Sequence, residues 1–463
     1  MKWVALAVIL ITAVGIVGWL RTNPRQAPLA WSMLTLLPFI MDPLNLIVAP
    51  YAIPFWSGYV KGWEISLLDA VAFGIVFGTR GRWPRMILII PFLAYILAVF
   101  VAVLQAPFPN YALSYPIQLL RILLVFLAVA RVAQTERGER ALLTGLILGI
   151  TIQAIYGISA RAGGAFQTGG SLGHQNLLGF VSHMALMPLF GMFLAGRWPV
   201  RALCGVLAGI LVVILTGSRA TILLAAFSLA LTLLVSISLR FSGQKIAFAT
   251  AGLILLSASA PFAYSTIERR MVAQQAGLTE KDQERVAFER AAGLMIAAKP
   301  MGVGPNHYVF VSITEGYASL AGVNWAMGNR AAQVHHSYLL VAAETGYLGL
   351  LTMITLLAVT IWYAFSTAVR YRREQEADVL IGVGCGILAI CIHALVEWMF
   401  VVYAVQYVFA GSLGLIVGLR SRLIDRKVET QRTNVRLKRD QNSSSMGSSS
   451  PVAVVLDHPP ARA

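Results

Sequence analysis

Arginines and histidines stand at the ends of long apolar blocks, where their side chains can meet a charged substrate. Arg219 lies in Thr216-Gly217-Ser218-Arg219-Ala220-Thr221, at the start of an expected helix. A helix N-terminus offers unpaired N–H groups and a guanidinium offers a planar fork, and both suit phosphate oxygens. An arginine that only snorkels to lipid headgroups is the alternative. Arg219 is therefore a candidate for binding an anion.

His336 begins another apolar block, directly after the longest hydrophilic segment. An imidazole with a reference pKa of about 6.5 suits general base work, for example on a sugar hydroxyl. The alternative is an interfacial histidine bonded to headgroups or to a carbonyl. His335 is an obvious rival to His336. Adjacent histidines diverge on a helix, which is poor geometry for chelation, and we expect neither a metal nor another cofactor.

Further polar residues accompany these candidates and belong to the same side of the expected membrane domain. They are Arg161, Asn176, Arg285, Arg290 and Ser337. No Asp-x-Asp cluster of the kind that holds Mg²⁺ against a diphosphate occurs on that side, so arginines must offset diphosphate charge.

Two charged positions lie within apolar blocks. Arg121 is expected to pair with Asp42 or Asp69, because a charge at that depth needs a partner. Glu397 follows His393 by one helical turn, and the pair either lines a cavity or holds helices together. We favour the structural interpretation for both positions.

The elements that carry these residues are membrane-spanning helices. The 463 residues are 58% hydrophobic and 12% charged, whereas soluble chains carry about 25% charged residues. The apolar blocks have roughly the 17–25 residues that cross a bilayer. They are 3–20, 29–50, 64–79, 86–104, 115–133, 141–160, 174–196, 200–217, 220–239, 246–265, 336–368, 377–399 and 401–419. We expect an all-α polytopic membrane protein with about 12–13 transmembrane helices.

Basic residues mark alternate connections, so the net charge of +16 reflects membrane topology and does not predict nucleic-acid binding. The positive-inside rule then places the C-terminus in the cytoplasm and the candidate residues outside. One long outer loop, 266–334, contains an expected amphipathic helix that ends at Lys299-Pro300. The retention of the first span, and with it the side of the N-terminus, stays open.

Four segments follow from this organisation. Residues 1–149 are N-terminal spans, 150–365 the core with its outer loop, 366–426 C-terminal spans, and 427–463 a polar tail that we expect to be disordered.

Four motifs occur in the order found in the O-antigen ligase and polymerase family, over about residues 150–365. They are Arg161 with Gly173-His174-Gln175-Asn176, the Arg219 stretch, Arg285 with Pro300-Met301-Gly302-Val303-Gly304-Pro305, and His336-Ser337-Tyr338-Leu339 with Glu344-Thr345-Gly346. The chain thus resembles these membrane glycosyltransferases, which include exopolysaccharide polymerases and have a GT-C-like helical architecture. Ser337 stands where the family often has Asn, and Gln175 where it often has Pro.

The resemblance implies a function for the candidate residues. The donor would be a glycan on undecaprenyl pyrophosphate at the outer leaflet of the bacterial inner membrane, and the acceptor either lipid A-core sugar of lipopolysaccharide or a second lipid-linked glycan. Arg219 and Arg285 would bind the pyrophosphate, and His336 would assist acceptor attack without a metal and with inversion at C1. The choice between ligase and polymerase stays open, as do the sugar, the linkage and the oligomeric state.

A polysaccharide or lipid-linked-sugar transporter is the alternative, because it would share the span count and the intramembrane charges. Transporters usually show internal repeats with broken helices at matched positions in two halves. Here the polar residues gather on one side only, which favours the enzyme.

Overall fold

The computed structural model describes residues 2–250, 280–324 and 332–447 and is almost entirely helical. Within these ranges nine helices are long and apolar enough to cross a membrane, and three shorter apolar helices accompany them. The nine are α1 (Lys2–Thr22), α5 (Pro109–Ala112) continuing into α6 (Ser114–Ala133), α7 (Glu136–Ala162), α8 (Gln175–Leu194), α9 (Pro199–Thr216), α10 (Arg219–Leu239), α15 (Ser337–Arg370), α16 (Glu376–His393) and α17 (Tyr403–Gly447). The all-α polytopic membrane fold is confirmed.

The three shorter helices match three further predicted spans. They are α2 (Ala27–Leu36) with η1 (Leu37–Phe39), α3 (Leu67–Gly78), and α4 (Ile89–Ala102) with η2 (Val103–Gln105). The predicted block 246–265 lies mostly outside the described residues.

The second apolar block, 29–50, is not one span as predicted. Its helical part ends at Phe39, and the chain then forms strand β1 (Ile47–Ala52), which pairs antiparallel with β2 (Gly62–Ser66). Asp42-Pro43 explains the break, because a residue before proline is pushed out of the α region. Apolar composition alone did not reveal the hairpin.

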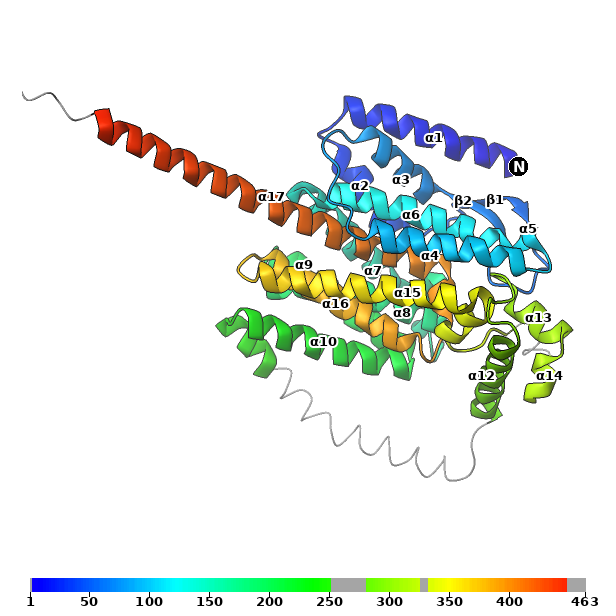
Figure 1. Cartoon of the computed structure of the whole chain (residues 1–463). Coiled ribbons are helices and arrows are strands. Elements are labelled where there is room, and N and C mark those ends of the chain that lie inside the picture. The colour runs from blue at the N-terminus through cyan, green and yellow to red at the C-terminus, as the bar shows by residue number, and fades with distance from the viewer. Residues whose placement is uncertain (1, 251–279, 325–331, 448–463) are drawn as a thin grey trace, which may run out of the picture.

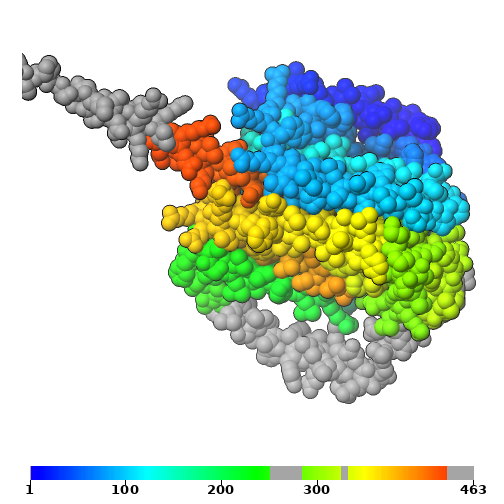
Figure 2. All heavy atoms as spheres, viewed as in Figure 1, coloured from blue at the N-terminus to red at the C-terminus, as the bar shows by residue number. Residues whose placement is uncertain are grey.

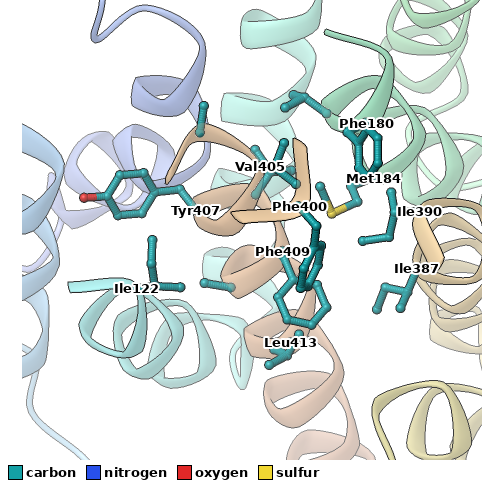
Figure 3. Packing of buried hydrophobic residues seen from close by; sticks show 14 of the residues in the cluster. Ile122, Phe180, Met184, Ile387, Ile390, Phe400, Val405, Tyr407, Phe409 and Leu413 are labelled. Atoms are coloured by element: carbon teal, nitrogen blue, oxygen red, sulfur yellow. The ribbon is translucent and has the colours of Figure 1, made fainter. Parts of the chain in front are cut away.

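The centre of the molecule is formed by α8, α16 and α17, which pack on one another, and α17 also packs closely on α6. Phe180 and Met184 of α8 meet Ile387 and Ile390 of α16, with the α17 residues beside them (Figure 3). A helix that is apolar on every face belongs in such a centre, and α8 is buried along almost its whole length.

One end of the bundle carries the connecting elements (Figure 1). β1, β2, α5, α12 (Glu280–Ala298), α13 (Tyr308–Thr314) and α14 (Tyr317–Ala321) gather there, and the C-terminal part of α17 projects from the other end. In the space-filling view the yellow-green surface at this end lies directly against the blue and cyan surface of the N-terminal half (Figure 2). The long connection therefore caps one end of the bundle.

The amphipathic helix of this connection is confirmed as α12, which ends at Ala298, just before Lys299-Pro300. Its buried face consists of Ala287, Phe288, Ala291, Ala292 and Met295, and it packs against α14 and α15. Val286, which repeats at helical spacing with the other apolar residues of this segment, is instead 66% exposed.

The glycine-rich turn after α12 lies against a break in α15 at Gly346, which has a φ of 67°. A β-carbon on Gly302 would come within 2.4 Å of the Glu344 carbonyl oxygen, so only glycine allows this approach. The Glu344 carboxylate accepts hydrogen bonds from the backbone N–H groups of Asn306 and Tyr308, both at 2.9 Å. This contact fixes the connection onto the membrane domain.

Arg121 pairs with Asp69, which is one of the two partners predicted for it. Arg121 Nε donates a hydrogen bond to Asp69 Oδ2 at 2.8 Å. Asp42 instead accepts a hydrogen bond from the Tyr403 hydroxyl. Glu64, which was not considered from the sequence, lies 3.6 Å from Arg121 Nη1.

The tail differs from the expected disorder over residues 427–447, where α17 continues to Gly447. No glycine or proline stands between Gly418 and Gly447, and a helix already nucleated in the bundle extends at little cost through such a stretch. Residues 448–463 lie outside the described residues.

Candidate active site

Glu397 is the common partner of several predicted site residues. Its Oε1 accepts a hydrogen bond from Asn176 Nδ2 and lies 3.4 Å from Arg285 Nη2, and its Oε2 lies 3.3 Å from His335 Nδ1. The Glu397 side chain is only 4% exposed, whereas Arg285 is 46% and His335 30% exposed. We call Asn176, Arg285, His335 and Glu397 the Glu397 cluster. It joins a buried carboxylate to a guanidinium and an imidazole that remain open to solvent.

Three separate elements position this cluster. Asn176 lies in the first turn of α8, Arg285 on α12, and His335 just before α15. Ser337 fixes the segment that carries Glu397, because its hydroxyl donates to the Glu397 carbonyl at 2.6 Å and its N–H donates to the Ala394 carbonyl at 2.8 Å. Ser337 is fully buried, so it positions the backbone of Glu397 from inside the protein.

Helix N-termini surround the same place. The α8 and α15 N-termini both contact the segment that carries Glu397. The α10 N-terminus packs beside that of α8, since a β-carbon on Gly179 would lie 2.2 Å from Thr221 Oγ1. Arg219 opens α10, is exposed, and forms no hydrogen bond or ion pair with the described residues. Helix N-termini and free guanidinium groups together favour a bound anion.

The two adjacent histidines have different hydrogen-bonding roles. His336 is the N-cap of α15, and its Nδ1 accepts from the Leu339 N–H at 3.3 Å. The proton of neutral His336 is then on Nε2, which can donate but not accept. His335 directs Nδ1 at the Glu397 carboxylate, which makes Nδ1 the donor and leaves Nε2 with a free lone pair.

His336 lies in a partly buried environment. Burial lowers its pKa below the ordinary value, and the nearby Glu289 carboxylate partly offsets this effect. Glu289 stands one helical turn after Arg285 on α12. One face of α12 therefore presents a cation to Glu397 and an anion to His336.

Arg161 and Arg290 are not joined to the Glu397 cluster. Arg161 Nη1 donates to the carbonyls of Ala165 and Phe166, at 3.1 and 2.7 Å, so it closes its own loop. Arg290 is exposed and has no partner among the described residues. Among those residues no group of three or more His, Cys, Asp and Glu side chains is arranged to hold a metal ion.

Glu397 is the functional candidate that the sequence did not reveal. It was interpreted as a structural partner of His393, on the assumption that both share one helix face. However, α16 ends at His393, and Glu397 turns into the polar end of the bundle. An acidic residue just beyond an apolar block was the available signal, and it gave no sign of which side chains would meet it.

The fold and this arrangement define a polytopic helical membrane protein in which arginine, histidine and asparagine side chains gather around a buried glutamate at one end. Residues 203–354 match the family model described as O-antigen ligase, which confirms the family predicted from the sequence. The matched segment contains Arg219, Arg285, His335 and His336, but neither Asn176 nor Glu397. No curated protein matches the chain. The match supports an O-antigen ligase- or polymerase-like function in a bacterial inner membrane.

Proposed function

We propose that the protein transfers a glycan from undecaprenyl pyrophosphate to a sugar hydroxyl at the outer leaflet of the inner membrane. The acceptor is lipid A-core sugar or a second lipid-linked glycan. The observation that carries this proposal is the Glu397 cluster, in which the Arg285 guanidinium from α12 and the His335 imidazole before α15 remain open to solvent beside a buried carboxylate. Three helix N-termini nearby add to the attraction for a diphosphate.

In the proposed reaction the acceptor oxygen attacks C1 of the donor sugar. The bond between C1 and the phosphate oxygen breaks, with inversion at C1, and undecaprenyl pyrophosphate leaves. Arg285 and Arg219 stabilise the charge that develops on the leaving oxygen, because guanidinium N–H groups donate hydrogen bonds to phosphate oxygens. The chain's own guanidinium groups take the part that a metal ion plays elsewhere, so the reaction proceeds without one.

The acceptor proton passes to an imidazole. The family resemblance assigns this step to His336. The hydrogen bonds favour His335, whose Nε2 is free and whose Nδ1 faces Glu397, the arrangement that holds a general base in its active tautomer. Glu397 also positions Asn176 and Arg285, so it couples the base to the diphosphate site.

The test is transfer by purified protein in detergent, with lipid-linked glycan as donor, candidate acceptors, and EDTA throughout. Arg285→Ala and Glu397→Gln are compared with the wild-type chain, and Arg161→Ala is the matched control at the same end of the bundle. We expect transfer that survives EDTA, is lost in the first two variants and persists in the control.

Either of two results would contradict the proposal. Transfer that disappears with EDTA and returns with a divalent cation would reject the metal-independent mechanism. Absence of transfer to any acceptor, together with movement of lipid-linked sugar across proteoliposomes, would favour the transporter.

A further inference from the structure

A second polar cluster lies at the same end of the bundle, on elements outside the family match. It consists of Asp42, Glu64, Asp69, Arg121, Tyr403 and Tyr407, and we call it the acidic aromatic cluster. Arg121 Nε donates to Asp69 Oδ2 at 2.8 Å, and the Tyr407 hydroxyl donates to Asp69 Oδ1 at 2.8 Å. In the close-up the Tyr407 oxygen points away from the other labelled side chains (Figure 3). The cluster is therefore a polar region beside the apolar core.

The charges of this cluster do not balance. Asp69 is buried and provides the close partner that Arg121 needs, at 2.8 Å. Glu64 is farther from the same guanidinium, at 3.6 Å, and Asp42 is exposed with only the Tyr403 hydroxyl bonded to it. Holding helices together explains the pair of Asp69 and Arg121. It does not explain two additional carboxylates at a membrane protein's polar end.

Two buried atoms in the cluster lack hydrogen-bond partners in the described part of the chain. They are Nη2 of Arg121, a residue only 9% exposed, and Oε2 of Glu64. Burial also raises the pKa of the Glu64 carboxyl. Buried polar atoms of native proteins nearly always have a partner, so a donor and an acceptor left open side by side indicate hydroxyl-bearing ligands or water. A sugar presents both donors and acceptors in that form.

Aromatic rings lie beside both the acidic aromatic cluster and the Glu397 cluster. Trp398 directly follows Glu397, and its ring centroid lies 6.4 Å from that of Tyr59. Tyr403 lies 6.2 Å from Tyr407, centroid to centroid. Trp398, Tyr59 and Tyr403 are all partly exposed. Amphipathic rings of this kind offer an apolar face and a polar edge, which suits the C–H faces and hydroxyl groups of a pyranose.

We propose that the acidic aromatic cluster is a subsite for sugar rings of the glycan substrate. This inference deepens the proposed function and rests on it for the placement of the diphosphate at the neighbouring Glu397 cluster. The surplus of carboxylates repels a diphosphate while it accepts hydrogen bonds from sugar hydroxyls, so the two clusters orient the lipid-linked glycan. Asp42 and Glu64 are the residues that select the sugar.

The experiment uses three probes made from the source cell's lipid-linked glycan. These are the intact lipid, the undecaprenyl pyrophosphate left after mild acid hydrolysis, and the soluble glycan released by that treatment. Affinities are measured for the full chain in nanodiscs. Asp42→Asn and Glu64→Gln remove a charge from partly exposed side chains with little change of shape. Glu315→Gln, an exposed acid paired with Lys299 at the same end, is the matched control.

We expect each cluster variant to weaken binding of the intact lipid and of the soluble glycan by about tenfold, since hydrogen bonds to charged groups are strong. Both should bind undecaprenyl pyrophosphate as the wild-type chain does, and the control should change none of the three affinities. A donor sugar would show this effect in the binding assay. An acceptor sugar would show it as a raised acceptor KM at saturating donor, and either pattern supports the subsite.

The proposal is overturned if both variants bind every glycan-bearing probe like the wild-type chain and keep the acceptor KM. Failure of the proposed function looks different. In that case undecaprenyl pyrophosphate binds equally well to the wild-type chain and to Arg285→Ala. The affinity for the soluble glycan is still lowered by Asp42→Asn and Glu64→Gln.

Discussion

Buried carboxylates anchor both ends of the helix bundle, Glu139 at one end and Glu397 at the other. Glu139 is completely buried, with Arg197 Nη1 2.6 Å from its Oε1 and Arg422 on its Oε2. Both of these arginines are themselves at most 7% exposed. The arginine and histidine partners of Glu397 lie farther away, at 3.4 and 3.3 Å, and their side chains are 46% and 30% exposed.

The difference shows how a structural charge cluster is told from a functional one. Close, fully buried partners leave nothing for a ligand to bind, and removal of one member leaves an uncompensated charge. Exposed partners at longer distance retain unused N–H donors. We therefore expect mutations at the Glu139 end to affect folding and mutations at the Glu397 end to affect transfer.

The largest effect is expected at the structural end. Glu139→Gln leaves Arg197 and Arg422 without their carboxylate, which should lower the free energy of unfolding by about 3–5 kcal/mol. Denaturant or thermal unfolding in detergent measures this loss. The molecules that remain folded should transfer glycan at the wild-type rate, and a stable variant with lost transfer would reverse the comparison.

The next effect belongs to Arg285. Arg285→Ala should reduce kcat by about 10²–10³-fold, as for removal of one stabilising donor at a transition-state oxyanion. Its ion pair is long and half exposed, so we expect a stability change of less than about 1 kcal/mol. Steady-state kinetics and thermal unfolding on one preparation measure both quantities. A large loss of stability would place Arg285 with the structural arginines.

The two adjacent histidines allow the same comparison, of loss of transfer against loss of stability, within the site itself. If hydrogen bonding decides the roles, His335→Gln should lose about 10²-fold in kcat, the lower range for general base catalysis. His336→Gln should mainly remove the α15 cap, at about 0.5–2 kcal/mol of stability. Transfer and unfolding of the two variants, measured in parallel, separate these outcomes. The reverse pattern would return the base to His336, as the family resemblance implies.

The smallest effect is a pH dependence. Burial lowers the pKa of folded His336, so the folded state binds a proton at this residue less readily than the unfolded chain does. A lowered folded pKa means that its contribution to stability is present above the unfolded value of about 6.5 and is lost as pH falls through the folded value. The free energy of unfolding, measured between pH 5 and 8, tests this prediction. In His336→Gln it should fall less on the acid side than in the wild-type chain.

Helix positions could be predicted from the sequence because lipid imposes a length and a composition on each span. The same argument failed between Phe39 and Ile47, where a proline turn follows an apolar helix without a change in composition. Residues 427–447 were expected to be disordered because they are polar. They are helical, since no glycine or proline stands between Gly418 and Gly447 of α17.

The candidate site could be predicted only as a set of polar residues. Arg285, His335 and Asn176 were candidates because polar residues are rare outside the apolar blocks, and that reasoning needs no distances. Glu397 required knowledge of where α16 ends and of what packs behind it. Arg161 was included by the same reasoning and instead bonds its own loop.

The attachment of the first hairpin has a consequence for the order of assembly. The loop between β1 and β2 depends on residues added much later: the Tyr59 hydroxyl donates to Glu344, 285 positions onward, and Val60 N–H donates to Asn306 Oδ1. Trp56 Nε1 likewise donates to the Asn306 carbonyl. During synthesis these groups stay hydrated at the membrane surface until α15 has been inserted. A chain stopped before Glu344 would therefore keep its N-terminal helices but lack the Tyr59 contact that holds this loop to α15.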